Sequence, residues 1–357
     1  MRLAIRARCP DREIALPHSV KTALKLIFSI SLCAIFLWKA FENADWKILW
    51  DTIQSANPGW IVLSAILIIL SCVPRAWRWQ TLMAPITDSH NLWRTFVAVL
   101  IGYAGNNVFP RAGEVARVVA IRRGRNLPMS GLLATVLVER VLDMITLLLF
   151  FGGILFAYRS RIAAVFPQLE RIGLVAFIVS AIFLASFLIL PMYGSKALTL
   201  IERVLGKVSR KLATRIIDIL KSILLGVGSI RSTKAYVGIV ISTIVMNGCY
   251  LLSIYLPFIS FGFPDQYGLN LASAFVVMVI ATVGIIIPTP GGTGTYHFFC
   301  SQALQHLYGV QQSEALAFAT VVHGLAYFGL LIAGGPGLLR LFWSKTDHTI
   351  ETNGSKS

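Results

Sequence analysis

The sequence has few charged residues for its length. Of its 357 residues 13% are charged and 56% are hydrophobic, whereas soluble domains carry about 25% charged residues. This composition excludes a soluble globular domain and a disordered chain. The charge is also unbalanced, with 32 basic against 16 acidic residues. In so apolar a chain we interpret the excess as basic loops that face anionic lipid, and not as a nucleic-acid surface.

Motifs of common enzymes are missing as well. The sequence contains no G-x-S-x-G, no H-E-x-x-H and no dinucleotide-binding glycine pattern. Its five cysteines include no C-x-x-C pair, and its histidines lack metal-ligand spacing. We therefore expect no disulfide, no metal, no cofactor and no enzymatic activity.

Long apolar runs are the main feature that is present. A membrane span needs about 20 mostly apolar residues. A basic tail at 1–21 precedes the first run, as in a signal peptide, but no small-residue cleavage site follows, so we expect an uncleaved helix. Two further apolar stretches, 93–109 and 270–288, each run into a Pro/Gly break. Six segments are long enough, or nearly so: 22–40, 59–76, 131–157, 172–192, 235–259 and 313–337.

Basic residues in the short loops predict the orientation. The 1–21 tail has five basic residues and the 195–234 segment has nine, so both are placed in the cytoplasm. The 41–58 loop has one lysine against three acidic residues, and the 260–269 loop has no basic residue. Both are placed outside. We expect a multi-pass protein of the inner (plasma) membrane with both ends cytoplasmic.

The stretch 93–109 conflicts with this rule if it spans the membrane, because the arginines that follow it would then lie outside. A hairpin that enters and leaves at the cytoplasmic face removes the conflict, and 270–309 fits a second hairpin from the outer face. Irregular backbone at membrane depth requires burial in protein or a cavity. We predict an all-α polytopic membrane protein with about six full spans, two broken re-entrant hairpins and inverted repeats at 59–157 and 235–337. The transmembrane domain would cover 22–340, followed by a polar tail at 341–357.

Three charged residues lie inside the apolar run 131–157: Glu139, Arg140 and Asp143. The helical period places Glu139 and Asp143 on one face, near the middle of the bilayer. Ionisable residues at this depth are usually functional. The alternative is a structural ion pair that holds helices together.

The break after 93–109 carries a second candidate site. Pro110 ends a helix, and the N-terminus of the next half-helix favours an anion. Arg111 and Arg117 would add phosphate-binding guanidinium groups, and Glu114 could pair with either. The alternative is a cytoplasmic anchor, which explains Asn106, Asn107 and Glu114 poorly. The pattern is Asn107-x-x-Pro110-Arg111-x-Gly113-Glu114-x-x-Arg117.

The second break is rich in glycine, with Gly291, Gly292 and Gly294 after two prolines. Such a turn can cradle a phosphate, or it can simply join two helices tightly. His297 follows it, and His323 lies inside the last apolar run. His323 fits either a hydrogen-bonded filler or a proton-coupled step.

Two basic segments remain. Arg75-Ala76-Trp77-Arg78-Trp79 ends the second apolar run, and Arg and Trp there are typical interface anchors, with contact to lipid headgroups as the alternative. The segment 196–222 has apolar residues at helical spacing. It predicts a basic amphipathic helix on the inner leaflet, or a linker helix that packs on the bundle.

Together, the 107–117 pattern, Glu139-Arg140-x-x-Asp143 and Pro290-Gly291-Gly292-x-Gly294 resemble the transmembrane domain of lysylphosphatidylglycerol synthases, which also occurs alone in flippase-like membrane proteins. The resemblance covers about residues 20–340 and implies translocation of a polar lipid between leaflets. In the full-length synthases a soluble domain aminoacylates the lipid, and from the short polar tail after 337 we expect no such activity here. Many members of the family carry Glu where His297 stands and Arg near His323, and two histidines could hydrogen-bond in their place.

We therefore expect transport of an anionic or phosphate-bearing lipid, either a phospholipid or a polyprenyl phosphate. Arg111 and Arg117 would capture the headgroup, the charges of 131–157 would form the passage and the glycine-rich turn would form a gate. Two alternatives are a membrane enzyme that acts on a headgroup, with Glu114 and His297 as its acid/base pair, and a scaffold for cell-envelope enzymes.

Overall fold

The computed structural model describes residues 18–87, 91–109, 112–157 and 233–354, with four single positions at 175, 178, 182 and 203. Within these ranges the regular elements are all helical. The predicted all-α membrane class is confirmed. The predicted span 172–192 and the amphipathic segment 196–222 lie outside the described residues, as do most of the 1–21 tail and the side chains of the 344–357 tail.

The long helices match the predicted spans. Four helical segments are long and apolar enough to cross a membrane. A bent pair, α1 (His18–Phe41) and α2 (Trp46–Ser55), adds a fifth when the two helices are taken together, with an angle of 89° between them. The four are Pro58–Met83, which comprises α3 (Pro58–Leu70) and α4 (Cys72–Met83), α7 (Met129–Ala157), α11 (Thr233–Ser260) and residues Gln312–Trp343 of α15 (Gln312–Gly354).

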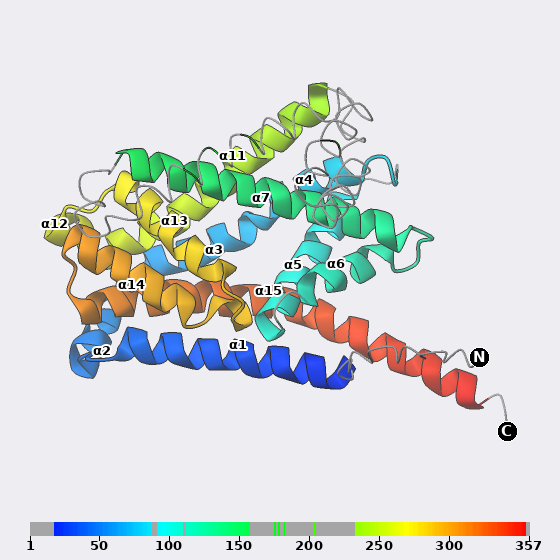
Figure 1. Ribbon diagram of the computed structural model, residues 1–357, viewed down its shortest axis with the longest axis horizontal. Helices are drawn as coiled ribbons and strands as arrows, with labels where there is room; N and C mark the ends of the chain where they lie inside the picture. The colour runs from blue at the N-terminus through cyan, green and yellow to red at the C-terminus, as the bar shows by residue number, and fades with distance from the viewer. Residues whose placement is uncertain are drawn as a thin grey trace, which may run out of the picture.

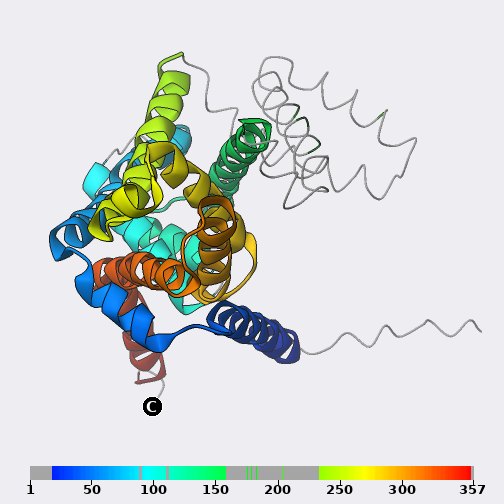
Figure 2. The same cartoon turned by 90° about the vertical axis from the view of Figure 1, so that its left-hand side faces the viewer.

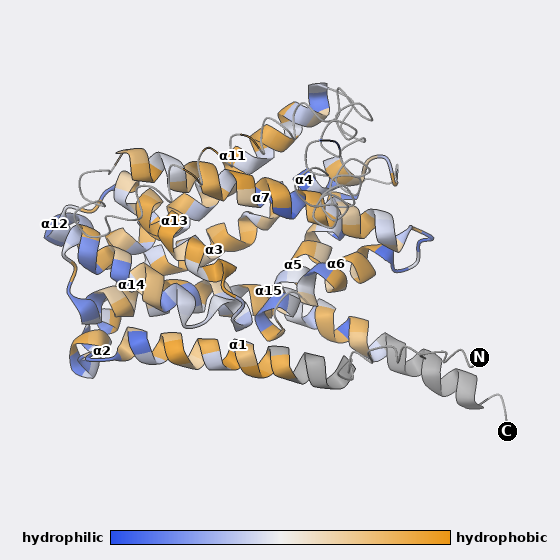
Figure 3. Cartoon of the chain, in the orientation of Figure 1, coloured by the Kyte–Doolittle hydropathy of each residue, from blue (hydrophilic) through white to orange (hydrophobic). Residues whose placement is uncertain are grey.

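The helices α1, α7 and α15 run along the long axis of the molecule (Figure 1). Hydrophobic residues follow their length, and hydrophilic residues gather near α2 and α12 (Phe263–Tyr267) at one end (Figure 3). Two hydrogen bonds connect the loops of this end, from Gln312 Nε2 to Glu42 O at 2.7 Å and from Ser260 Oγ to Asn57 O at 2.8 Å. The two loops predicted to be external therefore lie together. Which face of the bilayer they occupy stays a prediction.

The first predicted hairpin is present. It consists of α5 (Leu92–Val108) and α6 (Ala112–Arg122). The Arg94 guanidinium, at the start of α5, donates to the carbonyl oxygens of Ile121 and Arg123 at the end of α6, so the chain returns to the end at which it entered. Glycines allow this approach, because a Cβ on Gly113 would lie only 1.7 Å from Gly102 O. Pro110 and Arg111, at the break, lie outside the described residues.

The second hairpin consists of α13 (Leu271–Ile286), the short helix η1 (Pro290–Gly292) and α14 (Thr295–Tyr308). Its two helices also pack on each other, with the place of a Gly284 Cβ only 2.9 Å from Thr295 O. Gly291, Gly292 and Gly294 have φ values of 57°, 77° and 84°. Other residues adopt this region only with strain, so the turn requires glycine.

The tips of the two hairpins meet against α15. Asn107 Nδ2 donates to Tyr327 O at 2.9 Å, and Tyr327 Oη donates to Asn107 O at 3.0 Å. On the other tip, Gly291 O lies 3.2 Å from His323 Nε2. Broken helices that face each other are typical of inverted-repeat transporters.

The helix pairings follow the same plan in both halves. α5 packs on α15 as α13 packs on α7, and α6 packs on α7 as α14 packs on α15. The two largest hydrophobic cores lie around Trp79 and around Phe318, and each includes residues of both halves, with Leu330 in the first and Ile154 and Leu155 in the second. Figure 2 shows the bundle at right angles to Figure 1, with α1 at its edge. The repeat boundaries 59–157 and 235–337 and the opposite orientation of the two copies stay a prediction.

Candidate functional site

Glu139, the first of the three charged residues of α7, lies deep in the bundle. Glu139 is ten residues from the start of α7, or about 15 Å along a helix, which is half the thickness of a bilayer core. Its side chain is 0% exposed. The predicted shared face of Glu139 and Asp143 is confirmed, because both contact one nitrogen. Arg75 Nη1 lies 2.5 Å from Glu139 Oε1 and 3.0 Å from Asp143 Oδ2.

The interpretation of Arg75 and Arg78 as interface anchors is wrong. Arg78 and Trp79 are fully buried and Arg75 is 5% exposed. The helical path continues past Ser71 to Met83, so that these side chains stay inside the bundle instead of ending at its surface. Arg78 Nη2 lies 2.5 Å from Asp143 Oδ1, and its Nη1 donates to Thr243 Oγ1 at 3.2 Å.

The first hairpin contributes another buried cation, Arg117 of α6. Its Nη1 lies 3.0 Å from Glu139 Oε2. The guanidinium also lies over the ring of Trp79, 4.6 Å from the centroid. Trp79 is in turn fixed by a hydrogen bond from Nε1 to Thr135 Oγ1 at 3.0 Å. Arginines of two other helices, α4 and α6, therefore converge on Glu139.

We call this set of side chains the buried ion network. Four arginines against three carboxylates give it one excess positive charge. Buried charges are tolerated only when they are paired, and here the carboxylates are shared among several cations. Several guanidinium nitrogens still have no hydrogen-bond partner, among them Nε of Arg75 and Arg78 and both Nε and Nη2 of Arg117. The members of the network are Arg75, Arg78, Glu114, Arg117, Glu139, Arg140 and Asp143.

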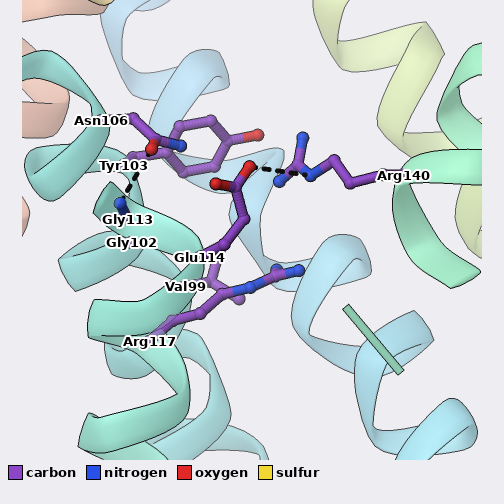
Figure 4. Close-up of a pocket in the computed structure, with 8 residues that line it drawn as sticks. All are labelled: Val99, Gly102, Tyr103, Asn106, Gly113, Glu114, Arg117 and Arg140. Atoms are coloured by element: carbon purple, nitrogen blue, oxygen red, sulfur yellow. Dashed lines mark hydrogen bonds and ion pairs between the residues drawn. The ribbon is translucent and has the colours of Figure 1, made fainter. Parts of the chain in front are cut away.

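A narrow pocket opens beside the network, between the first hairpin and α7. In Figure 4 the Glu114 carboxylate points toward Arg140, with Arg117 on the same hairpin helix as Glu114. Arg140 Nε lies 3.5 Å from Glu114 Oε1. The predicted pairing of Glu114 with Arg117 is wrong, because Arg117 pairs with Glu139 and Glu114 with Arg140. The alternative partner, Arg111, lies outside the described residues. The pocket is lined by Val99, Gly102, Tyr103, Asn106, Gly113, Glu114, Arg117 and Arg140.

Two tyrosines that the sequence analysis missed border the network. Tyr103 Oη and Tyr250 Oη lie 3.3 Å apart, and Arg75 Nη2 lies 3.4 Å from Tyr250 Oη. Tyr103 and Tyr250 come from α5 and α11, one helix from each predicted repeat. A tyrosine in an apolar run gives no sequence signal by itself. The buried carboxylates did give a signal for Arg75, because they required cationic partners.

The other predicted residues that the structure describes form a separate cluster at the hairpin tips. His297 and His323 have ring centroids 4.9 Å apart, and Gly294 N donates to His297 Nδ1 at 3.4 Å. The histidines thus meet through their rings. Asn107 lies four residues, about 6 Å of helix rise, beyond the pocket residue Tyr103.

The glycine-rich turn is closely covered by its neighbours. A Cβ on Gly291 would lie 2.6 Å from the Tyr327 ring, one on Gly292 3.2 Å from Ile285 and one on Gly294 2.6 Å from Cys33 O. This packing fits the alternative of a tight connection between two helices.

The proposed acid/base pair of Glu114 and His297 is divided between the two clusters. Glu114 contacts Arg140, whereas His297 contacts His323 and the ring of Phe41. In the described parts of the chain, no group of three or more His, Cys, Asp or Glu residues could hold a metal ion.

Comparison with known proteins adds the family. The lysylphosphatidylglycerol synthase TM region matches residues 23–334. The chain belongs to this family. It is similar to a UPF0104 membrane protein of Pyrococcus horikoshii, with 24% identity over 88% of this chain and 96% of the relative. A UPF0104 membrane protein of Methanocaldococcus jannaschii shares 26% identity over 77% of this chain and 82% of the relative.

A shorter match is to the glycosyltransferase AglD of Haloferax volcanii. It has 28% identity over 98 residues, which are 27% of this chain and 16% of that protein. No solved structure matches the chain.

Proposed function

We propose that this protein moves an anionic or phosphate-bearing lipid between the two leaflets of a cell membrane. The observation that carries the proposal is the buried ion network. It has one positive charge in excess and unused guanidinium donors beside the pocket between the first hairpin and α7. Guanidinium groups bind phosphate through paired hydrogen bonds. A lipid phosphate would therefore be stabilised where the bilayer alone would exclude it.

Different residues of the network have different roles in this proposal. Arg117 and Arg140 line the pocket and would hold the phosphate. Glu139 and Asp143 would position Arg75 and Arg78 and offset the energetic cost of burying these two cations. The two hairpin tips, which meet against α15, would form the gate. They lie on the far side of Tyr103 from the arginines of the pocket. Arg111 stays in the proposal as a capture residue from the sequence pattern alone.

The family supports this choice of cargo in a general way. Its name refers to a synthase of lysylphosphatidylglycerol, a lipid with a phosphate in its headgroup. Two cargo classes fit the network equally well, namely an anionic phospholipid and a polyprenyl phosphate. We further propose an inner-membrane location with both chain ends in the cytoplasm, and no enzymatic activity.

An accessory role for cell-envelope lipid or glycan enzymes is the second candidate. The match to part of a glycosyltransferase favours it, because a segment shared with such an enzyme can serve a partner enzyme in trans. Such a protein would retain its function in complexes and move no lipid by itself.

Reconstitution of the purified chain into liposomes tests the proposal. Labelled phosphatidylglycerol, a labelled polyprenyl phosphate and labelled phosphatidylcholine, which carries a phosphate but no net charge, would be loaded in separate vesicles. We expect faster exchange between leaflets of at least one anionic lipid than in vesicles with heat-inactivated protein. Equal exchange in both preparations, with and without a proton gradient, would contradict transport and favour the accessory role.

A further inference from the structure

The three carboxylates of the buried ion network are held very differently. Glu139 contacts three arginines, and so does Asp143. Glu114 has one ion-pair partner in the described chain, Arg140, and the pair is loose at 3.5 Å. The same Arg140 nitrogen forms no hydrogen bond. Glu114 is therefore the carboxylate that another anion can replace with the least disturbance.

Glu114 and Arg140 are also the members that a ligand reaches. Their side chains are 24% and 38% exposed, whereas that of Glu139 is 0% exposed; Asp143 is 21% exposed but does not line the pocket. Glu114 and Arg140 both line the pocket, and Arg117 beside them has Nη2 without a partner although it is buried. Asn106 accepts a hydrogen bond from Gly113 N through Oδ1, so its NH₂ group is the part that it can offer a ligand. The donors around the pocket thus suit an anion with several oxygens.

The charge of the network depends on Glu114. With Glu114 included, four arginines face three carboxylates, and the excess is one positive charge. Without Glu114, the four arginines face two carboxylates, and the excess is two positive charges. A phosphate group carries one or two negative charges, so the network can neutralise either form by keeping or releasing this side chain.

We propose that Glu114 is a built-in competitor for the phosphate site. Its carboxylate occupies Arg140 in the structure, and an entering phosphate group displaces it and binds Arg140 and Arg117. Glu114 leaves its partner without any covalent change, and the phosphate takes over the ion pair. This step rests on the proposed function only for the lipid nature of the ligand.

Binding to the purified full-length chain in a neutral detergent tests the proposal. The probes are a water-soluble short-chain phosphatidylglycerol and inorganic phosphate, measured by titration calorimetry. For Glu114→Gln we expect binding about two- to fivefold tighter, which is the range of a partly exposed ion pair. Glu42→Gln is the matched control, since it removes an exposed carboxylate paired with Lys39, and it should leave binding unchanged. Glu114→Asp keeps the charge but shortens the reach of the carboxylate, so it should also tighten binding. It serves as the second variant in case Glu114→Gln folds poorly.

A double variant separates competition from a general field effect. In an Arg140→Gln background the carboxylate has lost the cation for which it competes, so Glu114→Gln should no longer tighten binding. Tighter binding of the lipid assigns the site to a headgroup, and tighter binding of phosphate alone assigns it to the free ion. Unchanged or weaker binding of both probes to Glu114→Gln would overturn the proposal, as would tightening that persists without Arg140.

The outcome is distinguishable from failure of the proposed function. Tighter binding by Glu114→Gln in a protein that moves no lipid would contradict transport and leave the competitor in place. Lipid transport with unchanged binding by Glu114→Gln would contradict the competitor alone.

Discussion

Replacement of Glu139 by Gln should destabilise the protein strongly. Glu139 is fully buried, and its carboxylate faces Arg75, Arg78 and Arg117 at 2.5, 3.5 and 3.0 Å. In Glu139→Gln the side chain keeps its size, but Arg75 and Arg78 are then left with Asp143, and Arg117 loses its ion-pair partner in the described chain. Removing one partner of a buried ion pair typically costs about 3–5 kcal/mol, because the other charge is left uncompensated.

The assay is unfolding by SDS titrated into mild-detergent micelles, followed by tryptophan fluorescence. Glu42→Gln serves as the control, and for its exposed pair with Lys39 we expect a loss of about 0–1 kcal/mol. The double variant Glu139→Gln/Arg117→Gln removes one charge of each sign. Its loss should be smaller than the sum of the single losses, with a coupling of about 1 kcal/mol or more for side chains in one ion network.

A loss below about 1 kcal/mol for Glu139→Gln, with additive effects in the double variant, would refute the reasoning. Glu139 would then not be the counter-charge of the three arginines. In that case Glu139 would be available for a role in the transport step. As the structure stands, neutral variants of Glu139 and Asp143 test folding before they test transport.

Two further predictions concern the hairpins and the orientation of the chain. Gly113→Ala should prevent α5 and α6 from packing, because the new Cβ would clash with the Gly102 backbone. Gly248→Ala, whose Cβ would meet nothing within 4 Å, should leave the stability unchanged or raise it by about 1 kcal/mol. Equal unfolding curves for the two variants would argue against the close hairpin. In a background in which the native cysteines are replaced, cysteines placed at Asp51 and at Arg123 should react with an impermeant thiol reagent from opposite faces of intact vesicles. Labelling of both from the same face would contradict the predicted orientation.

Much of the fold could be predicted from local patterns. The Pro/Gly breaks and the arginines after 93–109 together predicted a hairpin, and the contacts of Arg94 with the end of α6 confirm it. Charge depth and helical period placed Glu139 and Asp143 on one face of a helix. These inferences needed only spacing along the chain and the energetic cost of charge in lipid.

The partners across the bundle could not be predicted in the same way. Arg75 and Arg78 lie at the end of an apolar run, where arginines also serve as interface anchors, so the sequence permitted two interpretations. Their contacts with α7 join residues 64 and 65 positions apart. The contact between Asn107 and Tyr327 spans 220 positions. Only the packing of the helices decides such pairs.

The most direct test of the central claim compares lipid exchange in liposomes that contain Arg140→Gln or Arg123→Gln. Both variants remove one arginine, but Arg140 lines the pocket and Arg123 is exposed in the loop after α6. Loss of one charged hydrogen bond to phosphate predicts exchange of the anionic lipid about tenfold slower for Arg140→Gln, with Arg123→Gln close to wild type. Equal rates for wild type and a folded Arg140→Gln would contradict a route through the buried ion network.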